Sequence, residues 1–445
     1  MRSEMLSLAE AKVPRYTSYP TAAQFTSAVG PDHVAGWLRA HAPAAPLSLY
    51  VHLPFCRQLC WYCGCNTTVT RRSAPIDRYL ATLGREIDLV AGLLREAPPV
   101  AHLHFGGGTP SVLEPAALLG LVAQLRARFA LLPDAEIALE VDPRGLDDAR
   151  IEAIAQAGAT RISLGIQDLD PDVQTAINRV QPLDLVTAKV DSLRRSGLAR
   201  IAMDLIYGLP RQTAETISRT ARAVAALAPD RVSLFGYAHV PWMKPHQRLL
   251  EPSGLPGAAQ RLELRDAASE ALVTAGYQRI GIDHFALQDD ALAQAARLGR
   301  LRRNFQGYTT DYAGTLIGFG ASAIGSFAEG HAQNAARTDA WSAAIDAGRL
   351  ATCRGIRTDD SDRRRGGIIE RLMCGFEADL AADIAEEPGL ADILDGLADL
   401  QRGGLVTRIG AQIRIPPEAH PFVRLVAARF DAYLATAGGR HAAAV

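Results

Sequence analysis

The sequence predicts an α/β protein built around an incomplete (β/α)6 parallel barrel. Short apolar, β-rich segments alternate with longer stretches whose apolar residues recur at helical spacing, and unusual polar residues gather just after the short segments. A strand, a helix and a second parallel strand form a right-handed unit, and six such units make a doubly wound sheet or an incomplete barrel. The barrel is favoured because barrel enzymes keep their sites where the strands end.

Each expected strand is short and ends near a Pro, Gly or Asp. The expected strands are 47–51, 100–105, 136–141, 161–166, 201–207 and 231–237. The helices expected between them are 76–94, 115–129, 148–157, 185–196 and 213–227. Beyond residue 240 the pattern loosens, with helices expected at 258–275, within 367–376 and at 390–401, and a hairpin at 405–415. These elements predict an N-terminal extension over the barrel (1–45), the barrel domain (46–330) and a small, mostly helical C-terminal domain (331–445) of winged-helix type.

Composition excludes several classes of function. Lys plus Arg number 47 and Asp plus Glu 48, so charge gives no reason to expect binding to nucleic acid or to a membrane surface. The N-terminus has no apolar core of signal-peptide length, and no apolar run approaches a membrane span. A cytoplasmic, monomeric protein is expected.

Four of the six cysteines lie between residues 56 and 65, a density that indicates a metal or cluster site and a reducing compartment. Cys56, Cys60 and Cys63 have the spacing C-x3-C-x2-C, which can hold three irons of a [4Fe–4S] cube and leave the fourth iron open. The alternative is structural zinc with Cys65 as fourth ligand, but zinc sites usually take their second ligand pair from a distant segment. Spacing alone does not make Cys65 a ligand. Cys353 and Cys374 are expected to be small buried hydrophobic residues.

Polar residues also end the later strands. A glycine run, Gly106 to Gly108, follows the second strand, where its backbone can approach a ligand closely. Four further polar residues lie at or after strands three, four and five: Glu140, Gln167, Arg179 and Asp204. Each alone is better explained as a helix cap or an internal partner. Together they form a ring of hydrogen-bonding groups at one barrel mouth, suited to ribose hydroxyls, a carboxylate and an adenine.

The cysteine spacing is the signature of radical S-adenosylmethionine enzymes, and the chain resembles the oxygen-independent coproporphyrinogen III oxidases (coproporphyrinogen dehydrogenases). The resemblance rests on the cysteine loop extended to CGCN (63–66), on PRYTSYP (14–20) and YAHVP (237–241), and on DHFA (283–286), NFQGYTT (304–310) and GFGAS (318–322). It implies that the cofactor-binding positions are Tyr50, Tyr62, Gly107, Gly108, Thr109, Glu140, Gln167, Arg179, Asp204, Ala238 and Ile324, and that Cys56, Cys60 and Cys63 hold the cluster. Arg179, with its planar fork, is the natural partner of the cofactor's carboxylate.

The resemblance also implies a reaction: anaerobic oxidative decarboxylation of two propionate side chains of coproporphyrinogen III to vinyl groups, giving protoporphyrinogen IX in haem biosynthesis. The implied cofactors are a [4Fe–4S] cluster and two S-adenosylmethionine molecules, and the implied electron source is a low-potential donor such as flavodoxin. Arg15 and Lys244 are candidates for meeting the substrate's carboxylates, and Tyr16, Tyr19 and Tyr308 for flanking the tetrapyrrole. Two alternatives stay open: a haem-trafficking paralogue without decarboxylase activity, and a radical enzyme acting on another tetrapyrrole such as haem.

Overall fold

The computed structural model describes residue 8 and residues 10–434, and they divide into two compact units. Unit 2 comprises Phe25–Asp204 and Asp311–Arg357, and unit 1 comprises Leu205–Thr310, Thr358–Val445 and Met1–Gln24 within the described range. The division falls within strand β7 (Ile201–Tyr207). No helix in the described range is long and apolar enough to cross a membrane.

Unit 2 is built on one mixed sheet with the strand order β16-β15-β14-β13-β1-β4-β5-β6 followed by β7. Its strands are β1 (Leu47–Leu53), β4 (Pro99–Gly107), β5 (Ala130–Val141), β6 (Arg161–Gln167), β13 (Thr315–Phe319), β14 (Ile324–Phe327), β15 (Gly330–Asn334) and β16 (Thr352–Arg357). β13, β1, β4, β5 and β6 pair in parallel, whereas β14, β15 and β16 add antiparallel hairpins. Six of the seven residues of β1 are buried, as expected for a strand covered on both faces.

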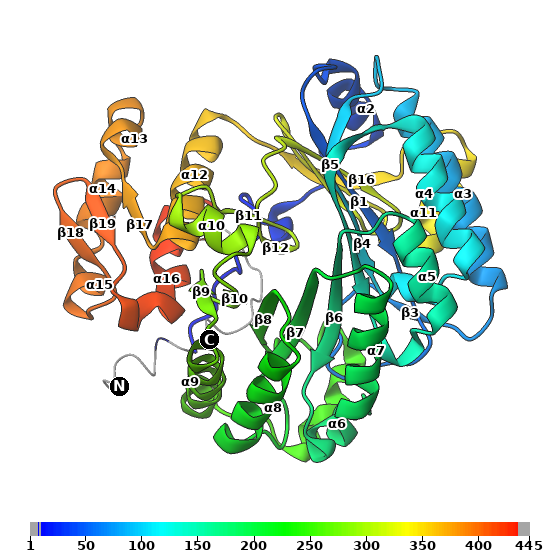
Figure 1. Ribbon diagram of the computed structural model, residues 1–445. Helices are drawn as coiled ribbons and strands as arrows, with labels where there is room; N and C mark the ends of the chain where they lie inside the picture. The colour runs from blue at the N-terminus through cyan, green and yellow to red at the C-terminus, as the bar shows by residue number, and fades with distance from the viewer. Residues whose placement is uncertain (1–7, 9, 435–445) are drawn as a thin grey trace. The chain divides into compact units, whose positions relative to one another are not determined.

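Helices cover the outer face of this sheet, each contacting the next in the order α11, α3, α4, α5 and α7 (Figure 1). The helices of unit 2 are α2 (Pro31–Ala40), α3 (Ala74–Ala91), α4 (Pro115–Arg128), α5 (Asp148–Gln156), α6 (Pro171–Ala176), α7 (Leu183–Arg195) and α11 (Thr338–Asp346). α3 buries Tyr79, Leu83 and Ile87, which recur every four residues along one face. The alternation of strand and helix predicted for residues 47–204 is therefore confirmed.

Unit 1 contains the strand order β7-β8-β10-β9, in which β10 pairs antiparallel with β8 and β9. Its elements up to Thr310 are β8 (Arg231–Gly236), β9 (Gln278–Ile280), β10 (His284–Ala286), β11 (Arg302–Asn304), β12 (Gly307–Thr309), α8 (Ala214–Ala226), α9 (Ala258–Thr274) and α10 (Ala291–Arg297). α8 and α9 pack side by side (Figure 1). β11 and β12 form an antiparallel hairpin. The motif NFQGYTT begins at the last residue of β11 and includes all of β12.

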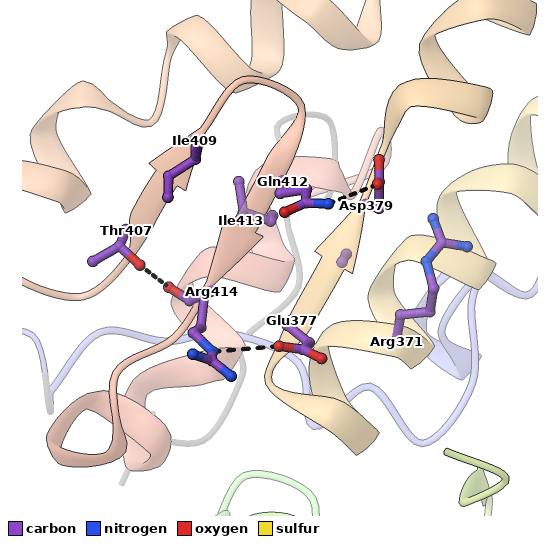
Figure 2. A pocket seen from close by; sticks show the side chains of 9 residues that line it. Arg371, Glu377, Asp379, Thr407, Ile409, Gln412, Ile413 and Arg414 are labelled. Atoms are coloured by element: carbon purple, nitrogen blue, oxygen red, sulfur yellow. Dashed lines mark hydrogen bonds and ion pairs between the residues drawn. The ribbon is translucent and has the colours of Figure 1, made fainter. Parts of the chain in front are cut away.

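The C-terminal part of unit 1 combines short helices with a three-stranded sheet of order β17-β19-β18. Its elements are α12 (Asp360–Gly375), β17 (Glu377–Asp379), α13 (Ala381–Glu386), α14 (Leu390–Asp395), α15 (Ala398–Arg402), β18 (Thr407–Ile409), β19 (Gln412–Arg414) and α16 (Val423–Ala427). A pocket of about 600 Å³ lies beside this sheet. Figure 2 shows side chains that line it, polar ones such as Arg371, Glu377 and Gln412 and the apolar Ile409 and Ile413. None of the predicted site residues lines it.

Two details differ from the sequence predictions. The single helix expected at 390–401 is two short helices, and the break between α14 and α15 begins at Gly396, a residue type of low helix propensity. Cys353 was predicted to be buried, and this is wrong: it is exposed on β16, the strand at the sheet edge. The predicted domain limits at residues 45 and 330 stay predictions.

Candidate active site

The predicted site residues of unit 2 follow strands whose carboxyl ends lie at one edge of the sheet. β1, β4, β5 and β6 run parallel, so the segments that follow Leu53, Gly107, Val141 and Gln167 all begin at that edge. The cysteine loop starts there, on the short strand β2 (Phe55–Cys56), which pairs with β3 (Thr68–Val69). This is the edge at which α/β proteins place their ligands.

Backbone hydrogen bonds fix the cysteine loop between neighbouring segments. The Thr70 amide donates to the Cys56 carbonyl over 2.9 Å, and the Trp61 amide donates to the Ile177 carbonyl over 3.0 Å. The Asn178 side chain donates to the Leu59 carbonyl over 2.8 Å. The loop is therefore held at both of its ends and in its middle.

Two guanidinium groups converge on one cysteine of the loop. Arg144 Nη2 and Arg179 Nη1 each lie 3.3 Å from the buried Cys60 Sγ. Asp142 holds both arginines, with Oδ2 at 2.6 Å from Arg144 Nη2 and 3.1 Å from Arg179 Nη1. Hydrogen bonds to a cysteine sulfur are one means by which a protein orients and tunes an iron–sulfur cluster, so these two donors suit a cluster ligand.

The other cysteines differ in exposure: Cys56 and Cys63 are half-buried, and Cys65 is exposed. Burial, followed by the neighbouring Cys63 and Cys60, raises the pKa of Cys56 to about 12. Thiolates crowded in this way repel one another until a cation is bound, so the donor set fits a metal cluster. In the described part of the chain, no three His, Cys, Asp or Glu side chains converge closely enough to hold a single ion. A cube differs in that its ligands sit at separate corners.

The glycine turn after β4 packs against the start of the cysteine loop. Gly107 has φ +115°, and a Cβ on Gly108 would lie 2.3 Å from the Phe55 carbonyl oxygen, so neither position accommodates another residue without strain. The amides of Gly108 and Thr109 donate to the Leu53 and Phe55 carbonyls over 2.8 and 2.9 Å. These amides are used within the protein, so the carbonyl oxygens of the turn are the groups suited to a ligand's amino group.

Glu140 is oriented by neighbours from two strands. Its carboxylate accepts hydrogen bonds from His104 Nε2 over 2.9 Å and from the Gly107 amide over 3.4 Å. Burial would raise the pKa of Glu140, but these two hydrogen bonds and the charge of His104 lower it below its usual value. The Tyr50 ring stacks on His104 with a centroid distance of 5.8 Å. An ionised carboxylate in a fixed position can accept hydrogen bonds from ribose hydroxyls or an ammonium group.

Gln167 adopts a left-handed backbone conformation, with φ +66°, at the end of β6. Such a conformation is strained for a residue other than Gly, Asn or Asp, and it occurs often at functional positions. On the next strand, Asp204 Oδ2 accepts a hydrogen bond from Ser163 over 2.9 Å. Arg179 donates from Nη2 to the Gly165 carbonyl over 2.6 Å, while its Nε is buried without a hydrogen-bond partner.

The predicted site residues fall almost entirely in one unit. All predicted cluster and cofactor-binding residues belong to unit 2 except Ala238, which follows β8 in unit 1. Ile324 begins β14, and Tyr62 lies in the cysteine loop. Three residues that contact the predicted site residues were not themselves predicted from the sequence: Asp142, Arg144 and His104. Asp142 and Arg144 stand directly after a predicted strand, as the predicted ring residues do, so their position was an available signal. His104 lies inside a strand, where nothing in the sequence sets it apart.

A cysteine loop, a glycine turn and a ring of polar residues at the carboxyl edge of a parallel sheet define a radical S-adenosylmethionine protein. The family model described as the Radical SAM superfamily matches residues 50–224, which include the cysteine loop, the glycine turn and the ring of polar residues. Of the predicted cofactor-binding positions, only Ala238 and Ile324 lie outside the matched range. This match confirms the predicted class and its incomplete-barrel fold.

Several relatives whose names state an activity are similar in sequence over nearly the whole chain. The oxygen-independent coproporphyrinogen III oxidase of Bradyrhizobium diazoefficiens is 46% identical over 100% of both chains. The protein of that name from Pseudomonas aeruginosa is 42% identical over 95% of this chain and 93% of its own. The solved structure of coproporphyrinogen III oxidase (HemN) from Escherichia coli, a radical SAM enzyme, has a TM-score of 0.90 and 38% identity, covering 95% of this chain and 100% of its own. The chain belongs to the oxygen-independent coproporphyrinogen III oxidases.

Proposed function

We propose that this chain converts two propionate side chains of coproporphyrinogen III to vinyl groups without oxygen, giving protoporphyrinogen IX and carbon dioxide. Membership of the family supports the substrate and the reaction. The observation that carries the proposal to these residues is the pair of guanidinium groups that contact Cys60 Sγ, because it places two hydrogen-bond donors on a sulfur in a loop whose spacing leaves one iron of a cube open. The bound cluster with S-adenosylmethionine would supply an organic radical able to take hydrogen from an unactivated carbon.

The chain's own residues have three tasks in this proposal. Cys56, Cys60 and Cys63 hold the cluster, with Arg144 and Arg179 donating hydrogen bonds to the Cys60 sulfur. The glycine turn, Glu140, Gln167, Arg179, Asp204 and the further positions Tyr50, Tyr62, Thr109, Ala238 and Ile324 bind and orient S-adenosylmethionine. The rest of the site excludes water. Because the cofactor performs the difficult chemistry, the protein contributes to the rate chiefly by positioning the reacting groups accurately.

Several further features belong to the same proposal. Two S-adenosylmethionine molecules are bound, one at the open iron and one beside it. The enzyme works as a cytoplasmic monomer, and a low-potential carrier such as flavodoxin reduces its cluster. The near balance of 47 basic and 48 acidic residues supports a protein that binds neither nucleic acid nor a membrane surface.

The test is anaerobic reconstitution of the full chain with iron and sulfide, followed by incubation with S-adenosylmethionine, dithionite and coproporphyrinogen III. The expected products are protoporphyrinogen IX, 5′-deoxyadenosine and carbon dioxide. Cys60→Ser should lose the iron-dependent absorbance and all turnover, whereas the matched variant Cys65→Ser should keep the cluster.

Three results would contradict the proposal: a full cluster in Cys60→Ser, zinc held by four thiolates, or a reconstituted enzyme that leaves coproporphyrinogen unchanged. Titration with haem separates the closest alternative. Tight stoichiometric haem binding without product would identify a trafficking protein.

A further inference from the structure

Four arginines gather in unit 1 at positions far apart in the sequence: Arg15, Arg261, Arg303 and Arg424, here called the arginine cluster. Arg15 is the common neighbour: besides burial, its charge lowers the pKa of Arg261 and of Arg424, and the charge of Arg303 lowers the pKa of Arg15 and of Arg424. Arg15 Nη2 donates to the Gly236 carbonyl over 2.9 Å, at the end of β8. None of the four takes part in the cysteine loop or the ring around it.

One carboxylate, that of Asp283, interacts with three members of the cluster: Arg15, Arg303 and Arg424. Asp283 Oδ2 lies 3.7 Å from Arg303 Nη2, and its Oδ1 is already bonded to His284 Nδ1 at 2.7 Å. Burial would raise the pKa of Asp283, but Arg303, His284 and Arg15 lower it to about 2, so it is ionised at neutral pH. Burial lowers the pKa of Arg424 to about 10, which still leaves it charged at pH 7. The single negative charge of Asp283 can neutralise at most one of the positive charges that act on it.

Arg303 shows that internal pairing uses only part of the hydrogen-bonding capacity of the cluster. Its side chain is 5% exposed, and its Nε and Nη1 atoms are buried without a hydrogen-bond partner. The guanidinium carbon lies 4.4 Å from the centre of the Tyr308 ring, and Tyr308 is itself fixed by donating to the Met373 carbonyl over 2.6 Å. Leaving donors of a buried cation unsatisfied is costly, so the arrangement is that of a site waiting for an anion.

The cluster reaches the surface at one end and lies against the end of β8. Arg15 is exposed, so one end of the cluster is open to solvent. A Cβ on Gly236 would lie 3.2 Å from Arg261 Nη2 and 2.9 Å from the Tyr207 hydroxyl, so glycine at this position lets both side chains lie against the strand end. Gly236 stands two residues before Ala238, which the proposed function assigns to cofactor binding. An anion bound to Arg15 would therefore sit beside that segment.

We propose that the arginine cluster binds the propionate carboxylates of the tetrapyrrole and thereby selects and orients the substrate. The inference rests on the proposed function for the identity of that substrate. Planar guanidinium groups bind carboxylates through two parallel hydrogen bonds, so several of them at fixed positions suit a ligand with several carboxylates better than a single-charge ligand. The methionyl carboxylate of S-adenosylmethionine shares this chemistry and is distinguished by the test.

The experiment measures binding of coproporphyrin III, the air-stable oxidised form of the substrate, to the full chain by porphyrin fluorescence. Arg303→Gln should raise Kd about tenfold or more, corresponding to ~1.4 kcal/mol. The matched control is the neighbouring Arg302→Gln, whose side chain is 51% exposed and pairs with Glu370, and it should leave Kd unchanged. The exposed Arg15→Gln should weaken binding in the same direction and provides a second variant in case Arg303→Gln does not fold.

Two further arms identify the source of the carboxylate. Coproporphyrin III tetramethyl ester carries no carboxylate, so wild type and Arg303→Gln should bind it equally. S-adenosylmethionine should bind the reconstituted Arg303→Gln enzyme as it binds wild type. Unchanged porphyrin binding in both Arg303→Gln and Arg15→Gln, or weakened cofactor binding with unchanged porphyrin binding, would overturn the inference. A wild type that binds coproporphyrin through these arginines but does not decarboxylate coproporphyrinogen would refute only the proposed function.

Discussion

At the scale of single residues, the glycine turn depends on close backbone approach. Gly108→Ala would place a methyl group 2.3 Å from the Phe55 carbonyl oxygen, which is backbone and cannot swing away. We expect the variant to lose about 1–3 kcal/mol of unfolding free energy and part of its cluster, because the displaced segment leads into Cys56. Urea unfolding and iron content measure the two effects.

The control for this substitution lies on helix α4. A Cβ on the exposed Gly120 would meet nothing within 4 Å, so Gly120→Ala should stabilise the protein by up to about 1 kcal/mol through helix propensity alone. Equal stability changes in the two variants would show that the contact with Phe55 is not what requires glycine at residue 108.

At the scale of elements, a buried carboxyl group connects α3 to the strand ends and to α11. Glu86 accepts hydrogen bonds from Trp341 Nε1 over 3.0 Å, from Asn334 Nδ2 over 2.7 Å and from the Gly320 amide over 2.6 Å. Burial raises the pKa of Glu86 to about 7 in spite of these three donors. The folded protein therefore binds this proton more tightly than the unfolded chain does.

The sign of the resulting pH dependence follows from that difference. The contribution of Glu86 to stability is fully present below its unfolded pKa of about 4.3 and falls as the pH rises through about 7. Glu86→Gln should remove this fall, so that wild type loses about 1–3 kcal/mol more than the variant between pH 5 and pH 8. Urea midpoints across this pH range measure the difference in stability. The control is Glu215→Gln, because the Glu215 side chain is 84% exposed. Parallel pH profiles for wild type and Glu86→Gln would contradict the assignment.

At the scale of the whole molecule, cofactor binding and folding are linked. A ligand that binds only the folded state at a hundred times its Kd adds about 2.7 kcal/mol to the unfolding free energy. We expect S-adenosylmethionine to raise the anaerobic urea midpoint of the reconstituted enzyme and to leave that of Cys60→Ser unchanged. A midpoint shift of the same size in both proteins would mean that the cofactor binds without the open iron.

The sequence by itself determined the features that depend on local pattern. Strand and helix positions from residue 47 to 237 follow from apolar periodicity, and β7 was predicted with its observed limits. The cysteine spacing identified the class of chemistry because three ligands in one loop need no distant partner. Resemblance in short motifs then led to the family, which the relatives confirm.

Only the tertiary structure decided which distant side chains meet. Arg144 follows one strand and Arg179 follows the next, yet both contact Cys60. Arg15, Arg303 and Arg424 likewise come from distant segments and interact with one carboxylate, that of Asp283. No local period encodes such encounters, because they depend on the order of strands and on how loops close over their ends. The physical reason is that the periodic pattern of apolar residues along the sequence indicates which side chains are buried. The charged partners of a side chain instead depend on which distant segments of the chain fold against it.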